Sequence, residues 1–155
     1  MKKLLGILML FCFIFIAKGE LYAKQAKDFT LPTIGGDKIS LSSLKGKKVL
    51  LDFLATWCPP CRQELKDISE IVSSYKGGNY EILCISVDNL ITTVSSFWKQ
   101  NNYKMTALFD DKNIANEYGV QAIPTLFLVD ESGEIVWEQV GSASKSKLIE
   151  ILELK

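Results

Sequence analysis

Two cysteines stand two residues apart in the segment Trp57-Cys58-Pro59-Pro60-Cys61, a spacing that suits a redox-active pair. The thiolate is the attacking species in disulfide exchange. A helix N-terminus favours the thiolate, because its free N–H groups and its dipole stabilise negative charge. Two prolines that can open a helix directly follow Cys58. Cys58 is therefore the candidate nucleophile, and Cys61, one turn on, is the resolving thiol that can close a disulfide with it.

Other roles for this cysteine pair are disfavoured by what the rest of the chain lacks. A zinc site normally needs two cysteine pairs, or one pair with histidines. Only Cys12 and Cys84 remain, and the 155 residues include no histidine, which also excludes Ser-His and Cys-His catalysis. A c-type haem site needs a histidine where Arg62 stands. A static structural disulfide remains an alternative, which the expected position between a strand and a helix disfavours.

The sequence around the pair predicts a buried strand and an amphipathic helix. Val49–Leu54 is a nearly continuous apolar run, which is typical of a strand buried on both faces. After Pro60, apolar residues recur at helical spacing as far as Tyr75, and Gly77-Gly78 ends the helix. Tyr80–Val87 predicts a second buried strand. The later predicted elements are a helix over 91–100, a strand over 104–109, a helix over 113–118, a hairpin with strands at 125–129 and 134–140, and a closing helix over 144–154.

The order of these elements indicates the fold class. Residues 24–46 form an extended lead-in, in which strand-like pieces at 28–32 and 38–41 flank the turn Gly35-Gly36-Asp37 and predict a β-hairpin. Strand and helix then alternate, followed by a second hairpin and a helix. We therefore expect an α/β fold with a central mixed sheet and helices on both faces. A composition of 48% apolar and 23% charged residues suits one globular domain of this kind.

Residues 1–23 have the order of features expected of an export signal. Met1-Lys2-Lys3 is a basic start, Leu4–Ala17 is an apolar run of 14 residues, and small residues stand at Ala17, Gly19 and Ala23. As a helix this run rises about 21 Å, short of the roughly 30 Å hydrocarbon core, which favours a cleaved signal over a permanent anchor. Either alternative places the domain 24–155 in the periplasm or elsewhere outside the cytoplasm.

The charge balance gives no sign of a nucleic-acid partner. The chain has 18 basic and 18 acidic residues and thus no net charge. A nucleic-acid-binding domain is usually basic, with Lys and Arg clustered on one face.

The segment Leu51–Cys61 resembles the active-site segment of the thioredoxin superfamily. It is most similar to the exported TlpA/ResA-like thiol-disulfide oxidoreductases, which overlap the redoxin and AhpC/TSA groups. The resemblance covers about residues 27–154 and implies a thioredoxin fold, an extra helix-strand unit at about 88–109, and an activity that needs no cofactor. Its other parts are Asp28-Phe29-Thr30-Leu31, Ser86-Val87-Asp88, Tyr118-Gly119-Val120, Ile123-Pro124-Thr125 and Val129-Asp130-Glu131-Ser132-Gly133.

The resemblance assigns supporting roles to further residues. Pro124 matches the family's cis-proline, which with Ile123 faces the cysteine pair and helps to bind the substrate backbone. Glu64 matches the acid of the Cys-x-x-Cys-x-x-Glu pattern, although the residues alone allow it to be a solvated helix charge. Asp52 occupies the position of the buried acid of thioredoxins, where many TlpA/ResA-like proteins carry a neutral residue. A buried carboxyl has a raised pKa and can carry a proton to or from Cys61.

Two further side chains near the pair have expected roles. Trp57 is expected to shield one side of the disulfide, with a place in the core as the alternative. Cys84 lies inside the apolar run 82–87. Lone buried cysteines usually behave as small hydrophobes, so we do not expect a third redox thiol there.

The predicted function is the reduction of disulfides in exported proteins by a monomeric enzyme without metal or other cofactor. The resemblance adds a membrane thiol-disulfide electron donor and, as one task, reduction of the haem-binding cysteines in cytochrome c maturation. Two alternatives stay open. One is a non-catalytic module that binds extended peptides beside Pro124, which the intact cysteine pair disfavours. The other is a thiol peroxidase of peroxiredoxin type, but that needs a Pro-x-x-x-Thr-x-x-Cys pattern and no proline stands between Val49 and Cys58.

Overall fold

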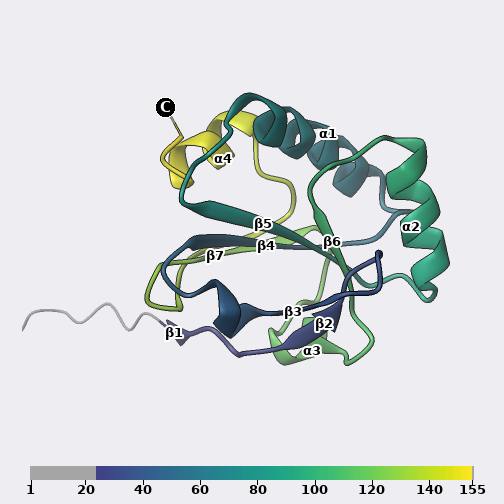
Figure 1. Cartoon of the computed structure of the whole chain (residues 1–155), viewed down its shortest axis with the longest axis horizontal. Helices are drawn as coiled ribbons and strands as arrows, with labels where there is room; N and C mark the ends of the chain where they lie inside the picture. Colours follow the sequence, from purple (N-terminus) through teal and green to yellow (C-terminus); the bar gives the residue numbers. More distant parts are fainter. Residues whose placement is uncertain (1–23, 155) are drawn as a thin grey trace, which may run out of the picture.

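A computed structural model describes residues 24–154 and builds them around one large β-sheet (Figure 1). The strands of this sheet are β1 (Lys24–Gln25), β4 (Lys48–Leu54), β5 (Tyr80–Ser86), β6 (Thr106–Phe109), β7 (Thr125–Val129) and β8 (Glu134–Val140). A separate hairpin consists of β2 (Thr30–Pro32) and β3 (Lys38–Ser40), and the 3-10 helix η1 (Leu41–Leu44) follows it. The α-helices are α1 (Pro59–Ser74), α2 (Ile91–Gln100), α3 (Ile114–Glu117) and α4 (Lys145–Ile151).

The large sheet is mixed, in the strand order β1-β8-β7-β4-β5-β6. β4 runs parallel to β5 and antiparallel to β7, and β5 runs parallel to β6. The predicted α/β fold with a central mixed sheet is therefore confirmed. The extra helix-strand unit expected at 88–109 is α2 followed by β6, and β6 extends the sheet beyond β5.

The two faces of the sheet are covered by different elements (Figure 1). Helices α1, α2 and α4 lie over one face, whereas the β2–β3 hairpin and α3 lie over the other. Leu65 of α1, Trp98 of α2 and Leu148 of α4 belong to one buried cluster. Leu31 of the hairpin and Tyr118, just after α3, belong to the second. The sheet thus separates two hydrophobic cores. Each core binds the covering elements on its side to the sheet.

Strand β4 lies between these two cores and leads directly to the cysteine pair. All its residues from Val49 to Leu54 are buried, which explains why its sequence lacks polar alternation. Leu50 and Leu54 pack into the cluster with α1, while Phe53 packs into the other. Because side chains alternate along a strand, Asp52 shares the face of Leu50 and Leu54. The one charged residue in the buried part of β4 therefore points toward α1.

Two details differ from the sequence expectation. Lys24–Gln25 pairs with Glu134 and Ile135 of β8 as β1, although the sequence predicts only an extended lead-in there. Both residues of β1 are exposed and polar, so the tertiary contact rather than a local pattern makes this strand. The last helix ends at Ile151, before the predicted end at residue 154. Glu153 adopts a φ of 55°, in the left-handed region, which cannot continue a right-handed helix.

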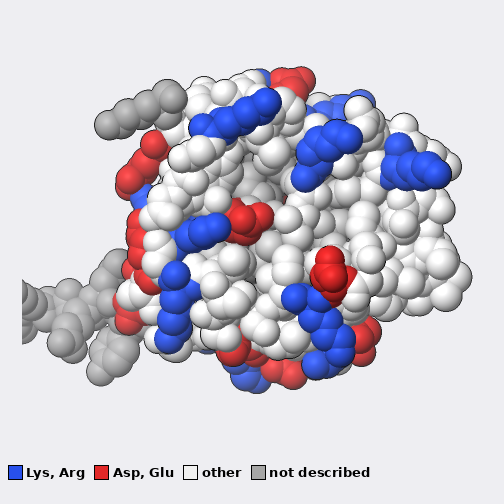
Figure 2. Space-filling model, viewed as in Figure 1, with Lys and Arg blue, Asp and Glu red and all other residues white. Residues whose placement is uncertain are grey.

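Charged side chains of both signs are distributed over the molecular surface that Figure 2 presents. Figure 2 shows acidic and basic side chains interspersed over the face viewed, without one continuous basic area. Across residues 24–154, no helix has the length and apolar character needed to cross a membrane. The export signal expected at 1–23 lies outside the described residues.

We predict that Phe53→Ala destabilises the oxidised protein by about 3–5 kcal/mol, the usual cost of truncating a buried phenylalanine. Phe53 is fully buried, and its ring centroid lies 5.4 Å from that of Tyr118 and 5.9 Å from that of Phe127. Urea denaturation measures the free energy of unfolding. Val140→Ala is the control, since this side chain is 64% exposed and should change stability by less than about 0.5 kcal/mol. Equal effects of the two changes would contradict the assigned core.

Candidate active site

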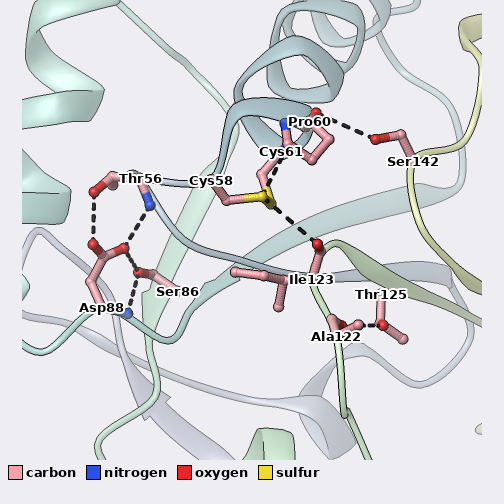
Figure 3. Close-up of a disulfide and its surroundings, with 10 residues drawn as sticks. All are labelled: Thr56, Cys58, Pro60, Cys61, Ser86, Asp88, Ala122, Ile123, Thr125 and Ser142. Carbon is pink, nitrogen blue, oxygen red and sulfur yellow. Dashed lines mark hydrogen bonds between the residues drawn. A yellow bond between two sulfur atoms is a disulfide. The ribbon is translucent and has the colours of Figure 1, made fainter.

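The turn between β4 and α1 places Cys58 at the N-cap of the helix (Figure 3). The N–H of Cys58 donates to the carbonyl oxygen of Ala55 at 3.2 Å, which closes the turn. Pro59 and Pro60 occupy the first helical positions, where their lack of an N–H leaves no donor unpaired. The N–H of Cys61 donates to the sulfur of Cys58 at 3.3 Å. A helical amide thus already points at the atom that would carry the thiolate charge after reduction.

Cys58 and Cys61 are joined by a disulfide, with their Cα atoms 5.3 Å apart. Their accessibilities differ in a way that matters for exchange. Cys61 is fully buried, whereas Cys58 retains 3% of its surface in contact with solvent. A substrate disulfide approaching from solution can therefore reach Cys58 but not Cys61. This difference supports the roles of nucleophile and resolving thiol given to them by the sequence.

The loop before β7 lies against the disulfide. The sulfur of Cys58 is 3.8 Å from the carbonyl oxygen of Ile123, and the Ile123–Pro124 peptide bond is cis, as the resemblance implies. The hydroxyl of Thr125 donates to the carbonyl oxygen of Ala122 at 2.6 Å and so stabilises the conformation of this loop (Figure 3). The fold therefore brings Ile123 to the pair, with Pro124 beside it.

Asp52 is completely buried on the face of β4 that α1 covers. Neither of its carboxyl oxygens has a hydrogen-bond partner in the part of the chain that the structure describes. Burial strongly raises the pKa of Asp52, and the negative charge of Glu64 raises it further. Burial therefore favours the protonated, neutral form of Asp52, which lies on the same face of the sheet as the cluster that contains Cys61.

Glu64 follows Cys61 by three residues on α1 and is only 1% exposed. Its Oε1 accepts a hydrogen bond from the N–H of Ala143 at 2.6 Å, while Oε2 has no partner among residues 24–154. Burial raises the pKa of Glu64 to about 7, although the Ala143 N–H works in the other direction; the charge of Asp67 adds to the rise. The alternative of a solvated helix charge is therefore wrong. Instead, Glu64 can take or release a proton near neutral pH.

Trp57 is 67% exposed, so the alternative that it belongs to the core is wrong. With Val87 and Ile123 it lines a groove of about 950 Å³. The rest of its lining is mixed and consists of Asp110, Asp111, Lys112, Asn113, Ala115, Asn116, Val120, Gln121 and Ala122. The groove adjoins the disulfide, because Trp57 precedes Cys58 in the chain and Ile123 lies against its sulfur. The expected shielding of the disulfide by Trp57 stays a prediction.

One buried group at the site was not singled out by the sequence. The carboxylate of Asp88 accepts hydrogen bonds from the N–H and the hydroxyl of Thr56 and from the hydroxyl of Ser86 (Figure 3). In the sequence, Ser86-Val87-Asp88 is recognisable only as one part of a family pattern. The sequence signal that could have indicated a role for Asp88 is its position just after β5. Because β4 and β5 are parallel, their carboxyl ends meet at the same edge of the sheet.

Cys84 is the free cysteine of the described residues and is fully buried. It lies opposite Asp52 in the pairing of β4 with β5. Burial and the neighbouring carboxyl charges of Asp52 and Glu64 raise the pKa of its thiol well above the usual value. Cys84 therefore fits the expected small hydrophobe. Within residues 24–154, no group of three or more His, Cys, Asp and Glu side chains is placed to hold a metal ion.

Comparisons with known proteins agree with this geometry. The model of the AhpC/TSA family matches residues 22–138. The thiol-disulfide oxidoreductase ResA of Bacillus thuringiensis subsp. konkukian is 36% identical over 131 residues, which cover 84% of this chain and 76% of ResA. A thiol:disulfide interchange protein of the thioredoxin family from Chlorobium tepidum TLS has a TM-score of 0.77 at 29% identity, covering 84% of this chain and 94% of that one.

A third similar protein is the exposed lipoprotein thioredoxin Etrx1 of Streptococcus pneumoniae strain TIGR4. Its TM-score is 0.73 at 30% identity, covering 82% of this chain and 98% of that one. The chain therefore belongs to the AhpC/TSA family, as a TlpA/ResA-like member of the thioredoxin superfamily. Its activity is that of a protein thiol-disulfide oxidoreductase.

The two buried acids predict an unusual dependence of stability on pH. In the folded chain the pKa of Glu64 is raised to about 7, whereas the ordinary pKa of a glutamate is 4.5. Between these values the folded state binds more protons than the unfolded state, so the free energy of unfolding falls as pH rises. For Glu64 alone the fall is about 3 kcal/mol. Asp52, shifted in the same direction, adds to it.

Urea denaturation at about pH 5 and about pH 8 tests this expectation. Glu64→Gln keeps an acceptor for the Ala143 N–H but does not titrate, so it should reduce the difference between the two pH values. The double variant Asp52→Asn/Glu64→Gln should nearly remove the difference. Glu131→Gln, in an exposed turn, is the matched control and should leave it unchanged. A wild-type protein that is equally stable at both pH values would contradict the protonated state of the two acids.

Proposed function

We propose that this enzyme reduces disulfides in exported proteins, with Cys58 as nucleophile and Cys61 as resolving thiol. The observation that carries the proposal is the placement of the pair. Cys58 retains contact with solvent beside the groove and its sulfur accepts the Cys61 N–H, while Cys61 and the two acids Asp52 and Glu64 are buried. Cys58 can therefore attack a substrate from the solvent side, and Cys61 can resolve the mixed disulfide from the buried side.

The reaction is an exchange of two electrons. The Cys58 thiolate attacks one sulfur of the substrate disulfide, a bond forms between Cys58 and that sulfur, and the other substrate sulfur leaves and takes a proton. Cys61 then loses its proton and attacks the sulfur of Cys58. This step releases the second substrate thiol and leaves the Cys58–Cys61 disulfide, so the substrate is reduced and the enzyme is oxidised.

Asp52 and Glu64 are proposed to exchange the proton of Cys61. Glu64 lies one helical turn from Cys61, and its pKa of about 7 suits a group that must hold a proton in one step and accept one in the next. Its Oε2, which is buried without a hydrogen-bond partner, is the atom available for that proton. Asp52 has a higher proton affinity than a solvated carboxyl and acts on the same side of the sheet.

The location and partners follow from the resemblance, supported by the expected export signal. Residues 1–23 direct export or anchor the chain, and 24–155 form the thioredoxin-like domain in the periplasm or another extracytoplasmic space. A structural relative described as an exposed lipoprotein supports this location. A membrane thiol-disulfide protein supplies the electrons to a monomeric enzyme, and haem-binding cysteines of cytochromes c are one substrate class.

Reduction of insulin by dithiothreitol tests the activity. We predict that the wild-type protein accelerates it, that Cys58→Ser abolishes the acceleration, and that Cys61→Ser traps a mixed disulfide through Cys58, visible on a non-reducing gel. Cys84→Ala is the matched control and should stay active, because Cys84 is sealed in the core. Full activity in Cys58→Ser would refute the mechanism. Turnover of hydrogen peroxide without insulin reduction would favour the peroxidase, and peptide binding without either reaction the binding module.

We predict a reduction potential below about −200 mV, on the reducing side of the range for such enzymes. Pro59 and Pro60 withhold two donors from the Cys58 thiolate, and negative charge on the buried acids would disfavour a thiolate near them. A less stable thiolate makes the dithiol form give up its electrons more readily. Titration of the Cys58–Cys61 pair against glutathione measures the potential. A value near about −120 mV, with a Cys58 pKa below about 5, would show that the enzyme is an oxidant.

A further inference from the structure

The turn that carries Trp57 and Cys58 is fastened to the end of β5 by one carboxylate. Oδ2 of Asp88 accepts the N–H of Thr56 at 2.8 Å and the hydroxyl of Ser86 at 2.6 Å. Oδ1 of Asp88 accepts the hydroxyl of Thr56 at 2.7 Å. The N–H of Asp88 in turn donates to the oxygen of Ser86 at 3.1 Å (Figure 3). Two segments 32 residues apart in the chain are thus joined at the active-site edge of the sheet.

The hydrogen bonds of this link are shielded from water. Asp88 is 7% exposed, Thr56 is 8% exposed and Ser86 is fully buried. Hydrogen bonds to an ionised acceptor are stronger than neutral ones, and a buried donor left without its acceptor carries the cost of its desolvation. Truncation of Asp88 would leave the Thr56 N–H buried without an acceptor, and the turn would have to move to give it another one.

The residues next to the link form one end of the groove. Trp57 follows Thr56 and Val87 precedes Asp88, and both side chains line the groove of about 950 Å³. Trp57 is 67% exposed, so packing contributes little to holding it in place. Its position depends instead on the backbone of Thr56, which the Asp88 carboxylate holds. The distance between Trp57 and Val87 is therefore set by the same carboxylate.

We propose that Asp88 is a positioning residue that sets substrate specificity. By holding Thr56, it keeps Trp57 beside Val87 at one end of the groove. These two side chains then contact the polypeptide segment next to the disulfide that is attacked. The groove offers apolar surface at Trp57, Val87 and Ile123 and both charged and amide side chains among residues 110–121, a combination that suits extended peptide. A small disulfide without a peptide segment needs only the sulfur of Cys58. This inference rests on the proposed function, since it concerns which disulfides the pair reduces best.

The test compares a polypeptide disulfide with a small one for each variant. Insulin is the polypeptide substrate, and 5,5′-dithiobis(2-nitrobenzoic acid) is the small disulfide. Asp88→Ala should raise the KM for insulin about tenfold, because Trp57 is displaced. Its rate toward the small disulfide should fall by a clearly smaller factor, because Cys58 is also held as the N-cap of α1 by the N–H of Cys61. Asp88→Asn should stay close to wild type, since its amide oxygen can accept the Thr56 N–H and its NH₂ can donate to the Thr56 hydroxyl.

A matched control comes from the opposite end of the sheet. Asp130 also holds a turn through three donors: the N–H and hydroxyl of Ser132 and the N–H of Glu134. Asp130→Ala therefore removes a similar set of hydrogen bonds away from the groove, and it should leave the ratio of the two activities unchanged. If Asp88→Ala alters both substrates equally, or neither, the inference is overturned.

A second variant keeps the inference testable should Asp88→Ala not fold. Trp57→Ala changes an exposed side chain and should raise the KM for insulin to a similar extent. If Asp88 acts through Trp57, the double variant should lose no more than Trp57→Ala alone. Additive losses, or an unchanged KM in Trp57→Ala, would overturn the inference. A wild-type protein that reduces neither substrate would instead overturn the proposed function itself, before the variants are compared.

Discussion

An amide hydrogen of α1 points at the sulfur of Cys58, and much of the fold serves to keep it there. The contact requires the first turn of the helix to start where β4 ends, at one edge of the sheet. It also requires β4 to be held from both sides, which β5 and β7 provide. Because Pro59 and Pro60 have no N–H, the amide of Cys61 is the earliest donor that α1 can offer. The helix therefore stabilises a thiolate, but with fewer donors than an ordinary first turn.

The same region of the core contains two acids that weaken it. Asp52 and Glu64 lose hydration on folding, and three of their four carboxyl oxygens gain no hydrogen bond from residues 24–154. Protonation limits this cost, because a neutral carboxyl is less expensive to bury than a carboxylate. The apolar clusters on both faces of the sheet must offset the remainder. The protein thus accepts lower stability at neutral pH in return for two groups that can hold protons where water does not reach.

The sequence was sufficient for features that depend on local pattern. The apolar run of β4, the prolines after Cys58 and the helical spacing to Tyr75 predict the strand, the turn and the helix that position the pair. Features made by tertiary contacts were not readable in this way. The exposure of Trp57, the pairing of Lys24–Gln25 with β8 and the reach of Asp88 to Thr56 depend on which segments meet in space. Burial of Glu64 likewise depends on the Ala143 segment that covers it.

The free thiol of Cys84 makes the enzyme sensitive to irreversible inactivation by heat. In the folded state Cys84 is enclosed and its thiol stays protonated, so it does not compete with Cys58 or Cys61. Unfolding removes that protection and places a free thiol and a disulfide in one mobile chain, where they can exchange. Refolding from such scrambled isomers is slow or fails, so the lifetime of the hot protein becomes a matter of rates rather than of equilibrium. Burial of Cys84 in the folded protein therefore preserves the disulfide between Cys58 and Cys61.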